Sequence, residues 1–388
     1  MHKNPLTPVI LVGPRSSQQL TYGMSIGFDL LITGFEDRKL PFYVVDRSQG
    51  MIGRRVGAFS WGGAGATINM LLAYLTKLPS SGTVYLTIGT SRSGFLRDML
   101  MIWSAWLLRR RIVLHLKGGG ISDFYAESPE WFKLILRKTF AKADTIVVLG
   151  KLLRSQFDFV PDIDRKLKIV PNGLPTEIQV QTTAPKSLEG APIIYVLYLS
   201  NMIPSKGYLD VLEACRILHV ERNIPIHFNF CGAFLETVNE ATDEQNIQGN
   251  TAEKFDLLRQ SKGVAEVSFY HGTVRGSQKQ ELLQQAHVFV LPTTYQWEGQ
   301  PISIIEALAF GTPVITTNYR GIPEQVIDQH NGFLVKPKSP TAIADAVEQL
   351  WRNPRQYQQM SSNAIAHYKA NFTQEAHLNR LIPTILEV

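Results

Sequence analysis

Short apolar runs recur along the first half of the chain, and each is followed by a glycine-rich or helix-like segment. The runs are PVILVG, FYVVD, VYLTIG, IVLHLK and TIVVLG, at residues 8–13, 42–46, 84–89, 112–117 and 145–150. Because they are almost wholly apolar and do not alternate with polar residues, we expect strands that are covered on both faces. The pattern predicts an α/β fold with a doubly wound parallel sheet.

The same alternation starts again after a break, and this indicates two domains. The segment KIVPNGLP, at 168–175, ends the first series with an Asn-Gly turn signal, and residues 176–191 are rich in Pro, Thr and Ser. A chain of 388 residues is long enough for two domains with full cores. We expect one domain over residues 1–178 and a second over residues 190–365.

The segment EGQPISIIEALAFGTPVITT, at 298–317, has the character of a binding site. Pro301 is expected at the first position of a helix, which a glycine and a proline end before the buried strand VITT. The free N–H groups at the start of that helix would suit a phosphate. Glu298 stands just before the helix and Glu306 lies one to two turns inside it, so one carboxylate is expected on either side of a bound phosphate.

A second segment of this kind is HLKGGGISDFY, at 115–125. It follows a predicted strand, so His115, Lys117, Gly118 and Gly119 should lie at the carboxyl edge of the sheet, where open α/β folds bind ligands. Lys117 could contact a phosphate or a sugar hydroxyl, and its pKa would have to be lowered by desolvation for it to act as a base. The alternative interpretation is a tight turn without a ligand.

The pattern E-G-x-P-x(4)-E-A-x-A-x-G-x-P-V-I over residues 298–315 resembles the signature of family 4 retaining glycosyltransferases. This resemblance implies the GT-B architecture, in which two Rossmann-like domains face a cleft. The first domain would bind the acceptor, the second would bind a nucleotide sugar, and a final helix over residues 366–388 would cross back to the first domain. Glu298 would hold the hydroxyls of the donor sugar, and Glu306 would hold those of the ribose. The donor-binding set would also include Gly299, Gln300, Pro301, Ile302 and Ser303.

Relatives in that family usually have Gly-Arg-x(4)-Lys-Gly after the first strand of the second domain. Here Lys206 and Gly207 match the pattern, but Asn201 occupies the position of the arginine. The resemblance therefore implies a catalytic role for Lys206 at the donor diphosphate, and Arg275 is the expected substitute for the missing cation.

The resemblance also assigns residues of the first domain. Gly23 is expected close to the donor phosphates, because relatives carry a glycine in the loop after the first strand. Where relatives often have His-x-His-Gly-Gly, this chain has His115 and Lys117, so Lys117 takes the position of the second histidine beside the transferred sugar. Glu298, Lys206 and Lys117 are the three residues to which the resemblance gives a catalytic role.

The resemblance as a whole implies a retaining glycosyltransferase of the hexosyltransferase type. It would move a sugar from a UDP- or GDP-linked donor to a glycan or lipid-linked acceptor, in the synthesis of cell-surface polysaccharide or glycoconjugates. We expect no metal and no cofactor, since no acidic pair of the D-x-D type follows a strand, and since the helix start with Lys206 can stabilise the leaving diphosphate.

Two other classes of protein are weighed against this one. Asn201 and Lys117 depart from the family pattern, which is consistent with a donor-binding but inactive partner subunit of a polysaccharide assembly complex. A nicotinamide-dependent oxidoreductase is disfavoured, because no G-x-G-x-x-G follows the first predicted strand.

Charge and composition bear on the partners and the location. Residues 1–180 hold 23 Lys and Arg against 13 Asp and Glu, whereas residues 181–388 hold 16 against 20. The basic half could contact lipid headgroups as a peripheral membrane protein, or it could simply be a solvated face; no nucleic-acid motif accompanies it. The helix-like segment 94–111, with its tryptophans and three final arginines, fits a membrane-surface helix or, preferably, a helix that covers the sheet. Two cysteines and no leader-like segment favour the cytoplasm.

Overall fold

The chain forms two units, which are described separately. The computed structural model describes residues 7–16, 23–48, 61–176, 184–235 and 251–386. Unit 1 consists of Met1–Pro175 together with Thr373–Val388, and unit 2 consists of Thr176–Phe372. Among the described residues, no helix is long and apolar enough to cross a membrane.

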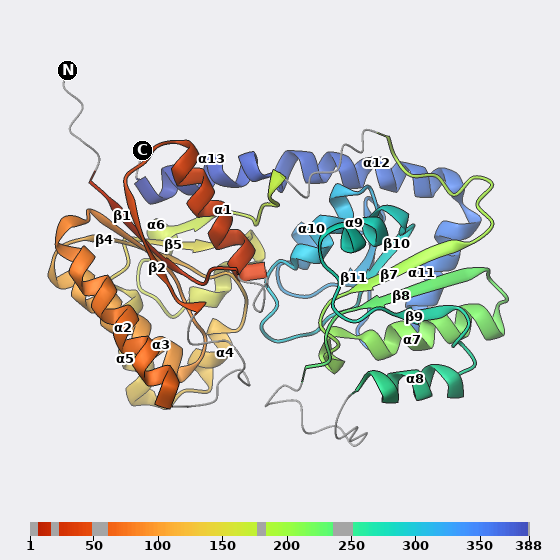
Figure 1. Ribbon diagram of the computed structural model, residues 1–388, viewed down its shortest axis with the longest axis horizontal. Coiled ribbons are helices and arrows are strands. Elements are labelled where there is room, and N and C mark those ends of the chain that lie inside the picture. The colour runs from red at the N-terminus through yellow and green to blue at the C-terminus, as the bar shows by residue number, and fades with distance from the viewer. Residues whose placement is uncertain (1–6, 17–22, 49–60, 177–183, 236–250, 387–388) are drawn as a thin grey trace. The chain divides into compact units, whose positions relative to one another are not determined.

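Unit 1 is built on a six-stranded parallel sheet with the strand order β2-β1-β3-β4-β5-β6 (Figure 1). The strands are β1 (Val9–Gly13), β2 (Phe42–Asp46), β3 (Thr83–Thr87), β4 (Arg111–His115), β5 (Thr145–Val148) and β6 (Leu167–Ile169). Alternate residues of one strand enter different cores: Ile10 and Val12 pack into one apolar cluster, and Val9 and Leu11 into the other. Burial on both faces explains why the strand sequences are apolar throughout.

Helices cover both faces of this sheet. The helices and 3₁₀ turns of unit 1 are α1 (Gly23–Asp37), α2 (Trp61–Lys77), η2 (Leu78–Ser80), α3 (Arg92–Leu107), α4 (Ile121–Ala126), α5 (Glu130–Phe140), η3 (Lys151–Phe157), α6 (Ile163–Lys166) and α13 (Gln374–Leu386). Side chains of α2, α3 and α5 fill one cluster, and side chains of α1 and α13 fill the other. The two layers follow from the two apolar faces of the strands.

The end of the chain packs in unit 1, against α1. A Cβ atom on Gly34 would lie 2.7 Å from Leu378, so the glycine allows α1 and α13 to approach closely. The guanidinium of Arg111 donates to the carbonyl of Ile385 at 2.8 Å. This segment starts at Thr373 and not at residue 366, because α12 (Pro354–Asn371) packs on α10 (Ile302–Ala309) and belongs to unit 2.

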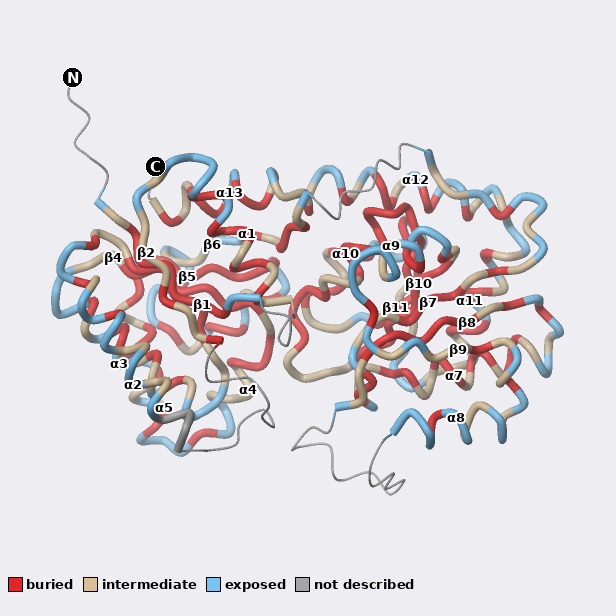
Figure 2. The backbone as a smooth tube through the Cα atoms, in the orientation of Figure 1, coloured by how far each residue is buried: buried red, intermediate tan, exposed pale blue. Residues whose placement is uncertain are grey.

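Unit 2 has its own six-stranded parallel sheet, with the order β12-β11-β10-β7-β8-β9. Its strands are β7 (Ile194–Leu199), β8 (Ile226–Cys231), β9 (Ser268–Tyr270), β10 (Val288–Leu291), β11 (Val314–Thr317) and β12 (Gly332–Val335). Its helical segments are η5 (Pro204–Lys206), α7 (Tyr208–Arg216), η6 (Ile217–Glu221), α8 (Ala252–Ser261), α9 (Gly276–Gln285), α10, η7 (Ile322–Glu324), α11 (Pro340–Arg352) and α12. Figure 2 shows β7, β10 and β11 as buried, in agreement with their apolar sequences.

Candidate functional site

The start of α10 follows the loop that leaves β10. Pro301 is the N-cap residue, with φ −54° and ψ 123°, and the helix begins at Ile302, one residue later than predicted. Ile304 through Ala309 are all buried, so this part of the helix has no solvent-exposed face, and Glu306 is buried together with its apolar neighbours. The reason is its place among β10, β11 and α12, which enclose it. Its amino end nevertheless carries backbone N–H groups that lack partners within the helix.

Lys206 and Glu298 meet beside this loop. The Lys206 Nζ lies 3.2 Å from Glu298 Oε2, and the hydroxyl of Thr293 donates to the same oxygen at 3.3 Å. The Lys206 amine also lies 5.0 Å from the centre of the Tyr295 ring. Glu298 is 8% exposed, so this ion pair is largely shielded from water. The structure thus brings together two of the three residues predicted to be catalytic.

Gly207 positions Lys206. Its φ of +80° is left-handed, and a Cβ atom there would come within 2.6 Å of Pro292. The backbone N–H of Thr294 donates to the carbonyl of Ser205 at 2.7 Å, which joins the Lys206 turn to the β10–α10 loop. A residue with a side chain at position 207 would push these two loops apart.

Glu306 is paired with a lysine that the sequence analysis missed. Its Oε1 accepts a hydrogen bond from Lys279 Nζ at 2.6 Å, and the residue is 3% exposed. Arg275, the expected substitute cation, is exposed at the N-cap of α9; Lys279 lies one turn further along that helix. Lys279 is therefore the cation that pairs with Glu306. Lys279 could have been selected from the sequence by its spacing of four residues from Arg275, since residues at this spacing share a helix face.

The Lys279–Glu306 pair gives a stability prediction. Lys279→Met should lower the free energy of unfolding by about 3–5 kcal/mol, because it leaves a buried carboxylate without its counter-charge. Adding Glu306→Gln should recover most of that loss, which urea unfolding of the single and double variants would measure. Lys254→Met, at an exposed lysine on α8, is the control and should change little. Additive losses in the double variant would contradict a direct interaction.

The other predicted donor residues are placed as follows. Asn201 follows β7 and is exposed, and its carbonyl accepts a hydrogen bond from the Tyr198 hydroxyl at 3.2 Å. The donor-loop residues Gly299, Gln300 and Pro301 are buried, whereas Ile302 and Ser303 are half-buried. Gln325, which was not predicted, donates from Nε2 to the carbonyl of Pro301 at 3.1 Å and so holds the N-cap.

A separate polar cluster lies within unit 1 at the carboxyl end of β4. His115 is completely buried, and its Nδ1 lies 2.7 Å from the Tyr85 hydroxyl. Lys117 is 7% exposed, and its amine has no hydrogen-bond partner within the described part of the chain. His377 of α13, which the sequence analysis did not select, donates from Nδ1 to the carbonyl of Pro171 at 2.5 Å. A neutral imidazole that donates from Nδ1 leaves Nε2 as an acceptor.

Burial lowers the pKa of each basic group in this cluster, and repulsion by neighbouring charges lowers the pKa values of the two histidines further. Burial lowers the pKa of Lys117 from 10.5 to about 7. Burial, and then the charge of Lys117, lower the pKa of His377 to about 3. The pKa of His115 is lowered well below 6.5 by burial, then by Lys117 and His377. Both histidines are therefore neutral at pH 7. Lys117 gains and loses its proton near that pH, and in its protonated form it can donate a hydrogen bond to a ligand oxygen.

Glycines allow the backbone to approach Lys117. Gly23 is the first residue of α1, but the glycine of α1 beside Lys117 is Gly27, where a Cβ atom would lie 3.2 Å from Nζ. Gly118 is half-buried and Gly119 is buried, and they lead to Gly120, whose φ of +82° caps α4. A turn thus follows Lys117, while the roles predicted for Gly118 and Gly119 at the ligand and for Gly23 at the donor phosphates stay predictions.

Part of the chain matches a known family. Residues 181–367 match the family model described as "Glycosyl transferases group 1". The chain is 34% identical over 113 residues to D-rhamnosyltransferase WbpZ of Pseudomonas aeruginosa, covering 29% of each protein. It is 41% identical over 86 residues to the putative teichuronic acid biosynthesis glycosyltransferase TuaC of Bacillus subtilis, covering 21% of each. The chain thus spans less than a third of the length of these relatives.

Solved structures agree with the fold over nearly the whole chain. Anabaena HepE in complex with UDP-glucose has a TM-score of 0.67 at 16% identity, covering 98% of this chain and 100% of that one. Sucrose-phosphate synthase from Thermosynechococcus elongatus has a TM-score of 0.68 at 18% identity, covering 96% and 97%. At these identities the likeness shows the fold alone. The predicted GT-B architecture with two Rossmann-like units is confirmed.

Proposed function

We propose that this chain is a retaining glycosyltransferase that transfers a sugar from a nucleotide-diphosphate donor to a glycan or lipid-linked acceptor. The family match over residues 181–367 supports this proposal, as do the names of the relatives, a D-rhamnosyltransferase and a putative teichuronic acid biosynthesis glycosyltransferase. The observation that carries it is the Lys206–Glu298 pair beside the start of α10. The cation and the helix amino end can bind the diphosphate, and the carboxylate can bind the hydroxyls of the sugar.

A bound donor would separate Lys206 from Glu298 and take the place of each partner in the ion pair. A diphosphate carries more negative charge than Glu298, so it would compete for the Lys206 amine and release the carboxylate toward the hydroxyls of the sugar. Glu306 holds Lys279 through Oε1 and would use Oε2 for the ribose hydroxyls. Lys279 would then supply positive charge that is absent at Asn201. The solved neighbours in complex with UDP and UDP-glucose support a UDP-linked donor.

The reaction needs no protein nucleophile in this proposal. The acceptor oxygen forms its bond to the anomeric carbon on the face from which the phosphate oxygen departs, so the configuration is retained. The acceptor proton passes to that phosphate oxygen. Lys206 and the α10 amino end stabilise the charge that grows on the diphosphate, which takes the electrostatic role of a metal ion. The enzyme would need neither a metal nor a cofactor.

A second candidate function is a donor-binding subunit without activity. Asn201 and Lys117, which stand where relatives carry an arginine and a histidine, favour it. Release of nucleoside diphosphate in the presence of acceptors separates the two, since an inactive subunit binds the donor without turnover. We propose a cytoplasmic location for either form, consistent with the buried free thiols of Cys215 and Cys231.

Donor binding can be tested with a pair of nucleotides. A thermal-shift series over UDP- and GDP-sugars should find one donor that stabilises the protein by about 2.7 kcal/mol at a hundred times its Kd.

Wild type should bind UDP roughly tenfold more tightly than 2′-deoxy-UDP, and Glu306→Ala should abolish that preference because it removes the acceptor for the 2′-hydroxyl. If wild type and Glu306→Ala show the same preference for UDP over 2′-deoxy-UDP, Glu306 does not bind the ribose.

A further inference from the structure

Helices α3 and α5 of unit 1 are apolar on their outer faces as well as on the faces that cover the sheet. The inner face of α3 buries Phe95, Met101 and Ile102. Outside, Leu100, Trp103 and Leu107 recur at spacings of three and four residues, and Leu107 is 74% exposed. A helix that only covers a core has polar residues on its solvent side. The preference for a core helix was therefore right for one face of α3 and left the other face unexplained.

The outer face of α5 continues this apolar surface. Trp131, Ile135 and Lys138 share one helix face by their spacing, and Trp131 is 65% exposed. An apolar hollow of about 620 Å³ lies between the two helices. It is lined mainly by Met99, Leu100, Trp103, Trp106, Leu107 and Ile135, with Lys138 at its edge. We call this region, with the basic pocket described next, the α3–α5 surface.

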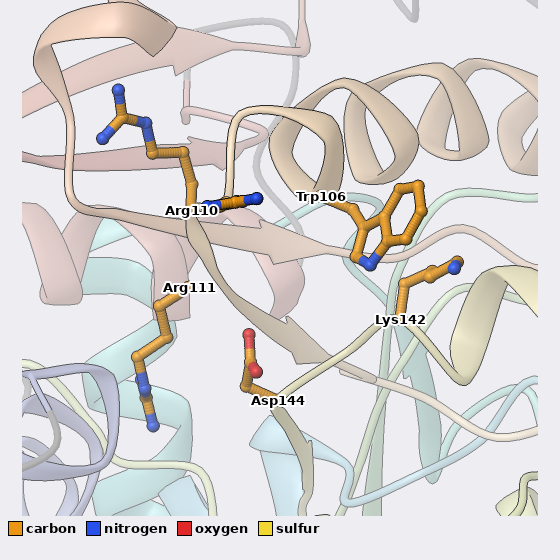
Figure 3. A pocket seen from close by; sticks show the side chains of 6 residues that line it. Trp106, Arg110, Arg111, Lys142 and Asp144 are labelled. Atoms are coloured by element: carbon orange, nitrogen blue, oxygen red, sulfur yellow. The ribbon is translucent and has the colours of Figure 1, made fainter.

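A basic pocket adjoins the hollow and shares Trp106 with it. The pocket has a volume of about 400 Å³ and combines four cations with one carboxylate, as Figure 3 shows for most of the lining. The lining residues are Trp106, Arg109, Arg110, Arg111, Lys142 and Asp144. The Arg111 guanidinium donates to the Ile385 carbonyl of α13. The Lys142 amine lies 3.4 Å from the centre of the Trp106 ring, so this contact marks the boundary between the charged and apolar parts.

We propose that the α3–α5 surface docks onto an anionic lipid bilayer, with lipid phosphate in the basic pocket and acyl chains against the tryptophans and leucines. Tryptophan beside lysine and arginine is the composition that favours the interface of a membrane, where the ring is half-solvated and the cation meets phosphate. A second copy of this chain fits less well, because a two-fold contact would use the same surface on both copies and so bring two basic pockets into one interface. The proposal is independent of the proposed function, since docking requires no sugar.

Vesicle binding tests the proposal. The full chain should bind vesicles of phosphatidylcholine with phosphatidylglycerol, and it should bind pure phosphatidylcholine roughly tenfold more weakly or worse. Leu107→Ser combined with Lys138→Glu should lower the affinity for the anionic vesicles at least about tenfold, because it removes one apolar anchor and reverses one charge. Brominated acyl chains should quench tryptophan fluorescence in wild type and less in Trp106→Phe.

The matched control lies on α8 of unit 2. Leu257 is 64% exposed and Lys254 is exposed one turn before it, so Leu257→Ser with Lys254→Glu makes the same chemical change elsewhere. This control should bind as wild type does, and both variants should keep the wild-type melting temperature. Equal affinity of the two double variants, or equal binding to neutral and anionic vesicles, would overturn the proposal. A shift from dimer to monomer in Leu107→Ser without any loss of vesicle binding would also overturn it, in favour of contact between copies.

Discussion

Lys206→Met should lower the rate of sugar transfer by roughly 10²–10³-fold while it changes the affinity for the donor much less. The Lys206 amine pairs with Glu298 beside the start of α10, and the charge that it would stabilise grows as the sugar–phosphate bond breaks. An interaction that strengthens in the transition state raises kcat more than it lowers KM. Release of nucleoside diphosphate at saturating donor measures kcat, and a thermal shift measures binding.

Two further variants make this prediction specific to the charge at that position. Lys206→Arg keeps a cation and should retain part of the activity, although the planar guanidinium cannot reproduce the point charge against Glu298. Lys254→Met, on exposed α8, should be as active as wild type. If Lys206→Met turns over at the wild-type rate, the leaving diphosphate is stabilised elsewhere and the proposed mechanism is wrong.

Lys117→Met should stabilise the protein at pH 7 by up to about 4 kcal/mol. Burial lowers the pKa of Lys117 from 10.5 to about 7. At pH 7 the unfolded state binds the Lys117 proton much more strongly than the folded state does, and the pKa difference corresponds to roughly 4 kcal/mol of lost folding free energy. Methionine has a similar length and no charge to desolvate. Urea unfolding of the full chain at a series of pH values measures the difference between the variant and wild type.

The sign of the pH dependence follows from the direction of the pKa shift. Between pH 7 and 10.5 the unfolded state binds more protons at Lys117 than the folded state, so the contribution of Lys117 to the free energy of unfolding rises with pH in that window. The advantage of Lys117→Met should therefore shrink by about 2 kcal/mol between pH 7 and pH 9. A difference that stays constant over this range would mean that Lys117 does not change its protonation there.

Lys186 is the matched control, because it is a second buried lysine whose pKa burial lowers to about 7. Its amine donates to the carbonyls of Leu283 and Ala286 and to the Thr312 hydroxyl, at 2.9, 2.5 and 2.8 Å. Lys186→Met would leave those acceptors without their donor and should destabilise the protein. Opposite signs for the two substitutions would show that the surroundings, and not burial as such, decide the effect.

The apolar strand runs were enough to predict the parallel sheets. Ile10 and Val12 enter one core while Val9 and Leu11 enter the other, and such double burial requires apolar residues at every position of the strand. The end of α10 at Gly311, with φ +66°, could be predicted because it depends on local backbone conformation, which the glycine itself controls.

The pairing of charges depended on the tertiary structure. Lys279 reaches Glu306 from another helix, and His377 reaches the Lys117 cluster from the far end of the chain. No periodicity in the sequence connects such residues, because the contact arises only when separate elements pack together.

What the sequence by itself determined was therefore the set of strands, turns and helix ends, together with the motif that carries Glu298 and Glu306. Only the tertiary structure decided which cation pairs with each carboxylate, that Gly27 lies against Lys117, and that α3 keeps an apolar outer face. The physical reason is that backbone conformation and the hydrogen bonds of helices and turns act between neighbours in the chain, whereas burial, charge pairing and the hydrogen bonds between separate elements act between neighbours in space.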